Sequence, residues 1–199
     1  MSGLFRALHR TKVFRNLTEQ EFAWVLYDVG NSAFILLVST LIPIYFNGLA
    51  EQVGVNSSDS VAYWGYAVSV STLIVALTGP VLGAVSDKKG RKKPLFLVSV
   101  LIGAVGCLCL GLFKKWLLFL IVFALAKVSY SISLIFYDSM LPDITDSDRM
   151  DRVSAQGYAW GYIGSCIPFL LCLTLVLGSD IIGSVSYTHL RAHETELHL

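Results

Sequence analysis

Two ionisable side chains lie inside stretches of sequence that are otherwise apolar. Asp28 is the only charged residue in residues 22–46, and Lys127 is the only one in residues 116–137. Asn31 follows Asp28 by about one helical turn, as Tyr130 follows Lys127, so each charge has a polar neighbour on its own helix face. A carboxylate in such a place can carry a coupling proton or act in gating, and an ammonium can bind an anionic group such as a carboxylate. The alternative is that each charge is neutralised locally and serves only helix packing.

The composition indicates a chain whose main solvent is lipid. Of 199 residues, 15% are charged and 55% are hydrophobic, whereas a soluble domain has about 25% charged residues. The formal net charge of +1 gives no electrostatic basis for binding nucleic acid. No histidine or convergent pair of carboxylates marks an enzyme site within the apolar stretches, so we expect no catalysis, cofactor or metal. A membrane-embedded enzyme or a non-transporting membrane scaffold stays open as an alternative interpretation.

Apolar segments of about 20 residues are long enough to cross a bilayer as helices. They lack the alternating pattern of barrel strands, and helices satisfy the backbone within lipid. The sequence therefore predicts an all-α membrane protein with five transmembrane helices, at about residues 22–46, 61–85, 94–113, 116–138 and 153–177.

The distribution of Lys and Arg predicts the orientation, because cytoplasmic segments retain these residues. Eleven of them lie in residues 1–21, in the loop after the second span and in the loop after the fourth, whereas the opposite loops hold only Lys114 and Lys115. We therefore expect residues 1–21 to form a cytoplasmic N-terminal segment of a multi-pass protein.

The loop between the second and third spans carries a specific motif. Gly83, Asp87, Gly90 and Arg91 lie at the spacing G-x-x-x-D-[RK]-x-G-R-[RK]. This pattern resembles the loop signature of the major facilitator superfamily, and it occurs between the same two spans. The resemblance implies the N-terminal six-helix half of a major facilitator fold, here lacking its sixth helix and the second half of the carrier.

The same resemblance implies roles for the motif residues. Asp87 would lie near the N-terminal end of a helix in the other half, where a negative charge is favourable. Gly83 and Gly90 would permit close backbone approach and a tight turn. Arg91 would reach an acidic residue near the end of span four, for which Asp138 is the candidate. Together they would form a latch that closes the cytoplasmic side of the carrier.

Three further runs resemble a narrower branch of this superfamily. They are Tyr-Asp-Val-Gly-Asn-Ser-Ala-Phe at 27–34, Phe-Tyr-Asp-Ser-Met-Leu-Pro at 136–142 and Ser-Ala-Gln-Gly-Tyr-Ala-Trp-Gly-Tyr at 154–162. They are similar to the autophagy-related vacuolar amino-acid effluxers and their bacterial relatives. The resemblance implies a secondary carrier of a small-molecule substrate, with a coupling proton and with amino-acid efflux as the activity that this branch suggests. The same resemblance implies a location in the plasma membrane if the protein is bacterial, or in the vacuolar membrane if it is fungal.

The last residues differ in character from the rest of the chain. Residues 22–183 hold the spans, whereas residues 184–199 carry three of the four histidines and show no apolar periodicity. They look like translated sequencing-adapter read-through, so we interpret them as a non-native tail and exclude them from the fold.

Overall fold

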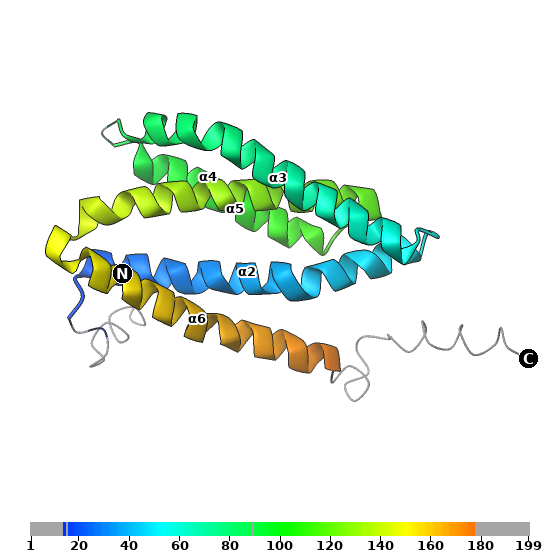
Figure 1. Ribbon diagram of the computed structural model, residues 1–199. Coiled ribbons are helices and arrows are strands. Elements are labelled where there is room, and N and C mark those ends of the chain that lie inside the picture. The colour runs from blue at the N-terminus through cyan, green and yellow to red at the C-terminus, as the bar shows by residue number, and fades with distance from the viewer. Residues whose placement is uncertain (1–13, 15, 89, 178–199) are drawn as a thin grey trace, which may run out of the picture.

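The computed structural model describes residues 14, 16–88 and 90–177, and within these ranges all of its regular secondary structure is helical. Figure 1 shows the five helices running side by side along one common direction. Their bounds are α2 Glu19–Glu51, α3 Ser57–Ser86, α4 Lys92–Leu110, α5 Trp116–Ile144 and α6 Ser147–Leu177. Each is long and apolar enough to cross a membrane, which confirms the predicted all-α fold with five spanning helices.

The helices extend beyond most of the predicted apolar segments. α2, α5 and α6 include polar turns that continue the backbone hydrogen bonding past the apolar core, whereas α4 ends at Leu110, three residues before the predicted limit of 113. The interpretation of residues 184–199 as a non-native tail, and most of the predicted N-terminal segment 1–21, lie outside the described residues.

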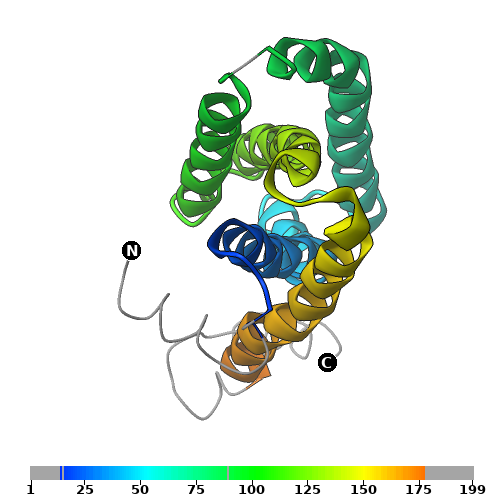
Figure 2. The ribbon, with the colours of Figure 1, turned by 90° about the vertical axis from the view of Figure 1, so that its left-hand side faces the viewer.

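The helices pack around a central pair. Figure 2 shows α2 and α5 in the middle, with α4 on the left, α3 on the right and α6 running below α2. The most extensive contacts join α2 to α6 and α4 to α5, followed by α3 to α5. We call the end that holds the α3–α4 turn and the α5–α6 connection the basic end, because Lys88, Arg91, Lys92 and Arg149 lie there.

Local signals place the helix ends at the basic end. Thr18 caps α2 through a capping box, in which its hydroxyl accepts a hydrogen bond from Glu21 N and Glu21 accepts one from Thr18 N. Gly90 has φ +80° in the short turn between α3 and α4. That backbone conformation strongly favours glycine, which explains the second glycine of the motif.

The buried apolar side chains form two clusters, one at each end of the bundle. At the basic end, Phe22, Trp24 and Val25 of α2 pack against Tyr137 and Val153. At the opposite end, the cluster comprises Phe46, Leu49, Leu110, Phe119 and Phe123. Between these clusters along α5, Ala126 and Phe136 are also buried.

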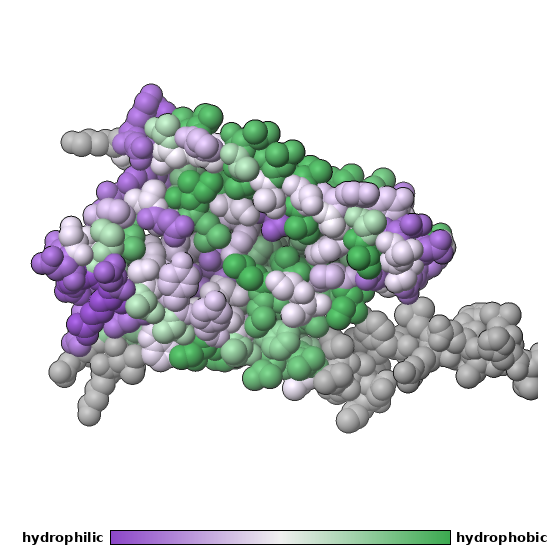
Figure 3. Space-filling model, viewed as in Figure 1, coloured by the Kyte–Doolittle hydropathy of each residue, from purple (hydrophilic) through white to green (hydrophobic). Residues whose placement is uncertain are grey.

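The outer surface of the bundle is apolar. Large side chains such as Leu77, Leu108 and Ile167 are exposed on α3, α4 and α6. In the space-filling view, hydrophobic residues spread over the middle of the visible face and hydrophilic residues gather at both ends (Figure 3). This distribution is the one expected of a bundle that spans a bilayer.

Glycines of α6 allow its close approach to α2. A Cβ atom at Gly157 would lie 2.7 Å from the Trp24 ring, and one at Gly164 would overlap the side chain of Val29. Small residues at such spacing let helix backbones pack tightly in lipid. The packing of α6 on α2 thus depends on the absence of side chains along this line.

Gly164→Ala is therefore expected to destabilise the bundle. Val29 is β-branched and has little rotamer freedom to move away, and overpacking of this kind costs about 1–3 kcal/mol. Gly65→Ala is the matched control, because its Cβ atom would meet nothing within 4 Å. The measurement is the thermal unfolding of the detergent-solubilised protein. Equal midpoints for the two variants would contradict the close α2–α6 packing.

Candidate functional site

A cavity of about 400 Å³ lies between α2, α5 and α6, and we call it the polar cavity. Its polar lining comes from all three helices. It comprises Asp28, Asn31, Ser32 and Ser39 of α2, Asp138 of α5, and Ser154, Tyr158, Tyr162 and Ser165 of α6. Trp24, Tyr137 and four aliphatic side chains complete the wall. In Figure 3, weakly polar residues lie on the visible face near α5 and α6, in the half toward the basic end.

Asp28 is buried in this wall, where it is 7% exposed. Its carboxylate faces two glycines of α6, since Cβ atoms at Gly157 and Gly161 would lie 3.3 and 3.2 Å from Asp28 Oδ2. Asp138 reaches the same cavity from α5. Neither carboxylate forms an ion pair with any lysine or arginine of the described ranges. Asp138 is exposed in the described chain, whereas the charge of buried Asp28 is costly unless it binds a proton or another cation.

A rigid contact fixes the cavity wall between α2 and α5. Trp24 and Tyr137 stack with their ring centroids 4.3 Å apart. Trp24 Nε1 donates a hydrogen bond to the carbonyl of Tyr137, and the hydroxyl of Tyr137 donates one to the carbonyl of Trp24. Because each side chain bonds to the backbone of the other helix, the two helices are held at one register beside Asp28.

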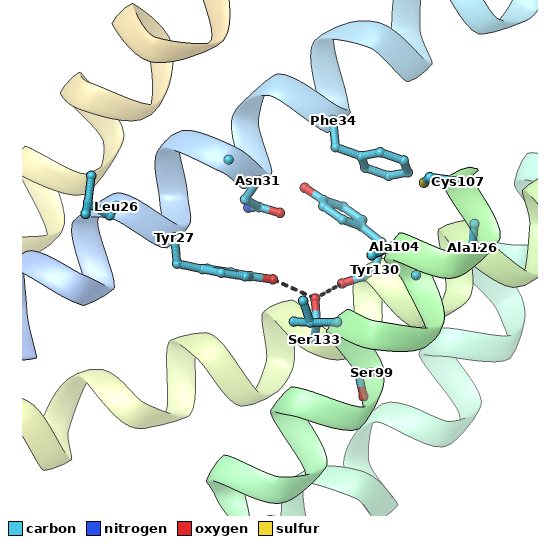
Figure 4. Close-up of a pocket in the computed structure, with 13 residues that line it drawn as sticks. Leu26, Tyr27, Asn31, Phe34, Ser99, Ala104, Cys107, Ala126, Tyr130 and Ser133 are labelled. Atoms are coloured by element: carbon cyan, nitrogen blue, oxygen red, sulfur yellow. Dashed lines mark hydrogen bonds between the residues drawn. The ribbon is translucent and has the colours of Figure 1, made fainter. Parts of the chain in front are cut away.

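A second cavity, of about 390 Å³, lies between α2, α4 and α5, and we call it the inner cavity. In Figure 4, Tyr27 reaches Ser133, and Asn31 and Tyr130 point toward one another. The hydroxyls of Tyr27 and Ser133 are 2.8 Å apart, and Ser133 donates to the carbonyl of Tyr130. Asn31 lines both cavities. It therefore connects the surroundings of Asp28 to those of Tyr130.

Lys127 lies apart from the cavity that holds Asp28. It is half-buried on α5 and lines neither the polar cavity nor the inner cavity. It lies on the helix face that carries Leu134 and Asp138, but eleven residues before Asp138, which is about 16 Å along α5. The structure therefore brings Asp28 and Asp138 to one cavity and leaves Lys127 outside it.

The motif residues lie together at the basic end. Gly83 is in the last turn of α3, where its carbonyl accepts a hydrogen bond from the N–H of Asp87, the C-cap residue of that helix. Asp87 and Gly90 line a cavity of about 460 Å³ beside Asp143. Arg91 is exposed and occupies the N-cap position of α4.

The structure does not bring Arg91 to Asp138. The ion pair that joins this turn to α5 is formed instead by Lys92 Nζ and Asp143 Oδ2, which are 2.7 Å apart. Lys92 also donates to the carbonyl of Ser139. Asp138 and Asp143 are five residues apart and therefore point to different sides of α5. As a result, Asp143 faces the turn, while Asp138 faces the polar cavity.

Residue-by-residue reasoning did not identify the contribution of α6 to the site. Ser154, Tyr158, Tyr162 and Ser165 all line the polar cavity. Their spacing of four, four and three residues places them on one face of a helix. That polar and aromatic stripe is the signal that could have predicted the third wall.

The comparison with protein families agrees with the fold and the loop motif. The model of the Major Facilitator Superfamily matches residues 12–187. The chain therefore belongs to this superfamily of membrane transporters.

Three relatives support this assignment. The chain is 38% identical over 168 residues to an uncharacterized MFS-type transporter, YxiO, of Bacillus subtilis. It is 28% identical over 192 residues to the lactose permease of Lactobacillus helveticus. It is 36% identical over 112 residues to the multidrug resistance protein MdtG of Citrobacter koseri. These matches cover 83%, 86% and 56% of this chain, but only 39%, 30% and 25% of the relatives. No solved structure matches the chain significantly.

Proposed function

We propose that this chain forms part of a secondary carrier that moves a small solute across a membrane by alternating access. The observation that carries the proposal is the polar cavity. It holds Asp28 and Asp138 without a cationic partner in the described ranges, inside a bundle whose outer surface is apolar. A volume of about 400 Å³ is within the range of small-molecule sites.

The helix contacts support a larger bundle. α6 packs on α2 and α3 packs on α5, so each central helix has an outer partner of this kind. α4 packs on α5, and the equivalent place on α2 faces an apolar groove lined by Phe34, Leu41, Cys107 and Leu110. Inverted repeats of three helices are typical of this superfamily. We therefore propose that a sixth helix of the longer protein occupies this groove, and that a second half completes the pathway.

The basic end supports the proposed orientation. Lys88, Arg91, Lys92 and Arg149 lie there, and cytoplasmic ends of spans are rich in such residues. We propose that the N-terminus is cytoplasmic. Because the relatives described above are bacterial, we favour the bacterial plasma membrane over a vacuolar one.

We propose distinct roles for the sequence-predicted residues. Asp28 serves proton coupling or gating, with Asn31 and Tyr130 as its polar neighbours toward the inner cavity. Lys127 binds an anionic group on the face of α5 that also carries Asp138, but at a separate position along the helix. Asp87 and Arg91 act in the cytoplasmic latch, with the Lys92–Asp143 pair as the contact that holds their turn against α5.

Flux in proteoliposomes tests the proposed function. The full-length protein is reconstituted with an imposed proton gradient and offered amino acids, the solutes that the branch resemblance suggests, together with lactose and an organic cation. We expect gradient-dependent flux of at least one solute, and none from residues 1–183 alone, because alternating access needs two halves. No flux from folded full-length protein would contradict the proposal. Flux from the isolated fragment would contradict the two-half mechanism.

A further inference from the structure

The charges that line the polar cavity are all of one sign. Asp28 and Asp138 contribute two carboxylates, and no lysine, arginine or histidine is among the lining residues. The two ion pairs within the described ranges are Lys92–Asp143 and Arg149–Glu21, and neither involves a cavity residue. An anionic ligand would meet uncompensated negative charge here, whereas a cation would be attracted to both carboxylates.

Aromatic rings add to this preference. Tyr158 and Tyr162 of α6 line the cavity opposite the stacked pair of Trp24 and Tyr137. In the described chain the two α6 tyrosines are 64% and 73% exposed, so their rings are free to contact a ligand. The faces of tyrosine and tryptophan rings attract organic cations, and they do so most strongly where water is excluded.

An unpartnered acceptor lies between the polar cavity and the inner cavity. Asn31 is only 9% exposed, and its Oδ1 atom has no hydrogen-bond partner in the described part of the chain. Buried acceptors of this kind are rarely left unpaired in a folded protein. The Oδ1 atom points toward the hydroxyl of Tyr130 in the inner cavity (Figure 4), and that hydroxyl also has no partner in the described part of the chain. Asn31 lines the polar cavity as well, so a hydrogen-bond donor that reaches past Asp28 to this side chain would satisfy its oxygen.

We propose that the polar cavity binds its solute through a positively charged ammonium group, placed between Asp28 and Asp138 with the α6 tyrosines around it. The inference rests on the proposed function and specifies the substrate class of that site. It assigns no part of this contact to Lys127, which lies outside the cavity. One small amino acid cannot contact Asp138 and Lys127 at once, because about 16 Å of helix separates them.

Binding of matched pairs of probes to the purified full-length carrier tests this inference. Choline is compared with its uncharged isostere 3,3-dimethylbutan-1-ol, and butylammonium with pentan-1-ol, by calorimetry at neutral pH. We expect each cation to bind at least about tenfold more tightly than its neutral partner, because the neutral probe lacks the charged contact with the carboxylates and rings. Asp28→Asn and Asp138→Asn should each remove this preference. Asp59→Asn, at an exposed position in the first turn of α3, should keep it.

Several outcomes would overturn the inference. The first two are equal binding of the charged and neutral probes, and no binding of either ammonium probe. The third is tighter binding of isobutyrate, an anion, than of the cations. The fourth is a binding heat from sodium ions alone that is lost in Asp28→Asn and Asp138→Asn. The unfolding temperature of each variant separates loss of the site from loss of the fold. If Asp28→Asn stops the flux of a neutral or anionic solute while no ammonium probe binds, the proposed carrier stands and the substrate class is wrong. If ammonium probes bind but no solute is moved, the cation site stands and the proposed function is wrong.

Discussion

Asp28→Asn is expected to reduce solute flux by the full-length carrier about ten- to a hundredfold. The substitution keeps the size of the side chain but removes its charge, and a hydrogen bond to a charged group contributes about 1.5–3 kcal/mol. Asp28 is buried in the wall of the polar cavity without a cationic partner in the described ranges. Its charge therefore serves the proton or the solute rather than the packing of the bundle.

The measurement is the initial rate of flux in proteoliposomes. Asp59→Asn is the matched control, because it makes the same chemical change at an exposed position and should leave the rate unchanged. The unfolding temperature of Asp28→Asn should stay at or above that of the unmodified protein, since removal of an unpaired buried charge does not weaken a fold. Full flux in Asp28→Asn would assign this residue to packing.

Glu21→Ala is expected to give the largest loss of stability, about 2–3 kcal/mol. Glu21 is 1% exposed at the start of α2. It accepts hydrogen bonds from Thr18 N, Thr145 Oγ1 and Arg149, at 2.7, 2.6 and 2.7 Å. Its removal would take this acceptor from Thr18 N and Thr145 Oγ1, and Arg149 would keep only its hydrogen bond to the carbonyl of Asn16. The α5–α6 connection would then be released from α2. Arg149 is partly exposed, which keeps the expected loss below that of a fully buried pair.

Thermal or denaturant unfolding of the detergent-solubilised protein measures this loss. Glu19→Ala is the control, because Glu19 lies in the same first turn of α2 but is exposed. Its replacement removes only a helix-dipole contribution of about 0.3–1 kcal/mol. Equal stability of the two variants would show that the Glu21 cluster does not hold the connection.

The number of helices and their approximate positions could be predicted from the sequence, because the bilayer sets the length of each apolar segment. The polar extensions of α5 to Ile144 and of α6 from Ser147 were not visible in that pattern. Helices continue past the apolar core where polar turns can still satisfy the backbone, and hydropathy carries no signal for that.

It was harder to predict which residues form the site. Asp28 and Asn31 stood out because polar groups are rare inside spans. Asp138 was assigned to the latch, but it lines the cavity, because the helix period places Asp143 rather than Asp138 toward the α3–α4 turn. The role of Lys127 depends on which helix faces it. The tertiary packing decides which helix that is, and the sequence of α5 alone does not.

The central claim is that the face of α2 lining the polar cavity meets water within the membrane. Cysteine labelling in cells tests it most directly, using Ser32→Cys in a cysteine-free background of the full-length carrier and a membrane-impermeant thiosulfonate reagent. Leu101→Cys is the comparison, because Leu101 lies on the outer, apolar side of α4. We predict rapid labelling at position 32 and none at position 101. Labelling at 101 with protection at 32 would place the polar cavity away from water and contradict the account.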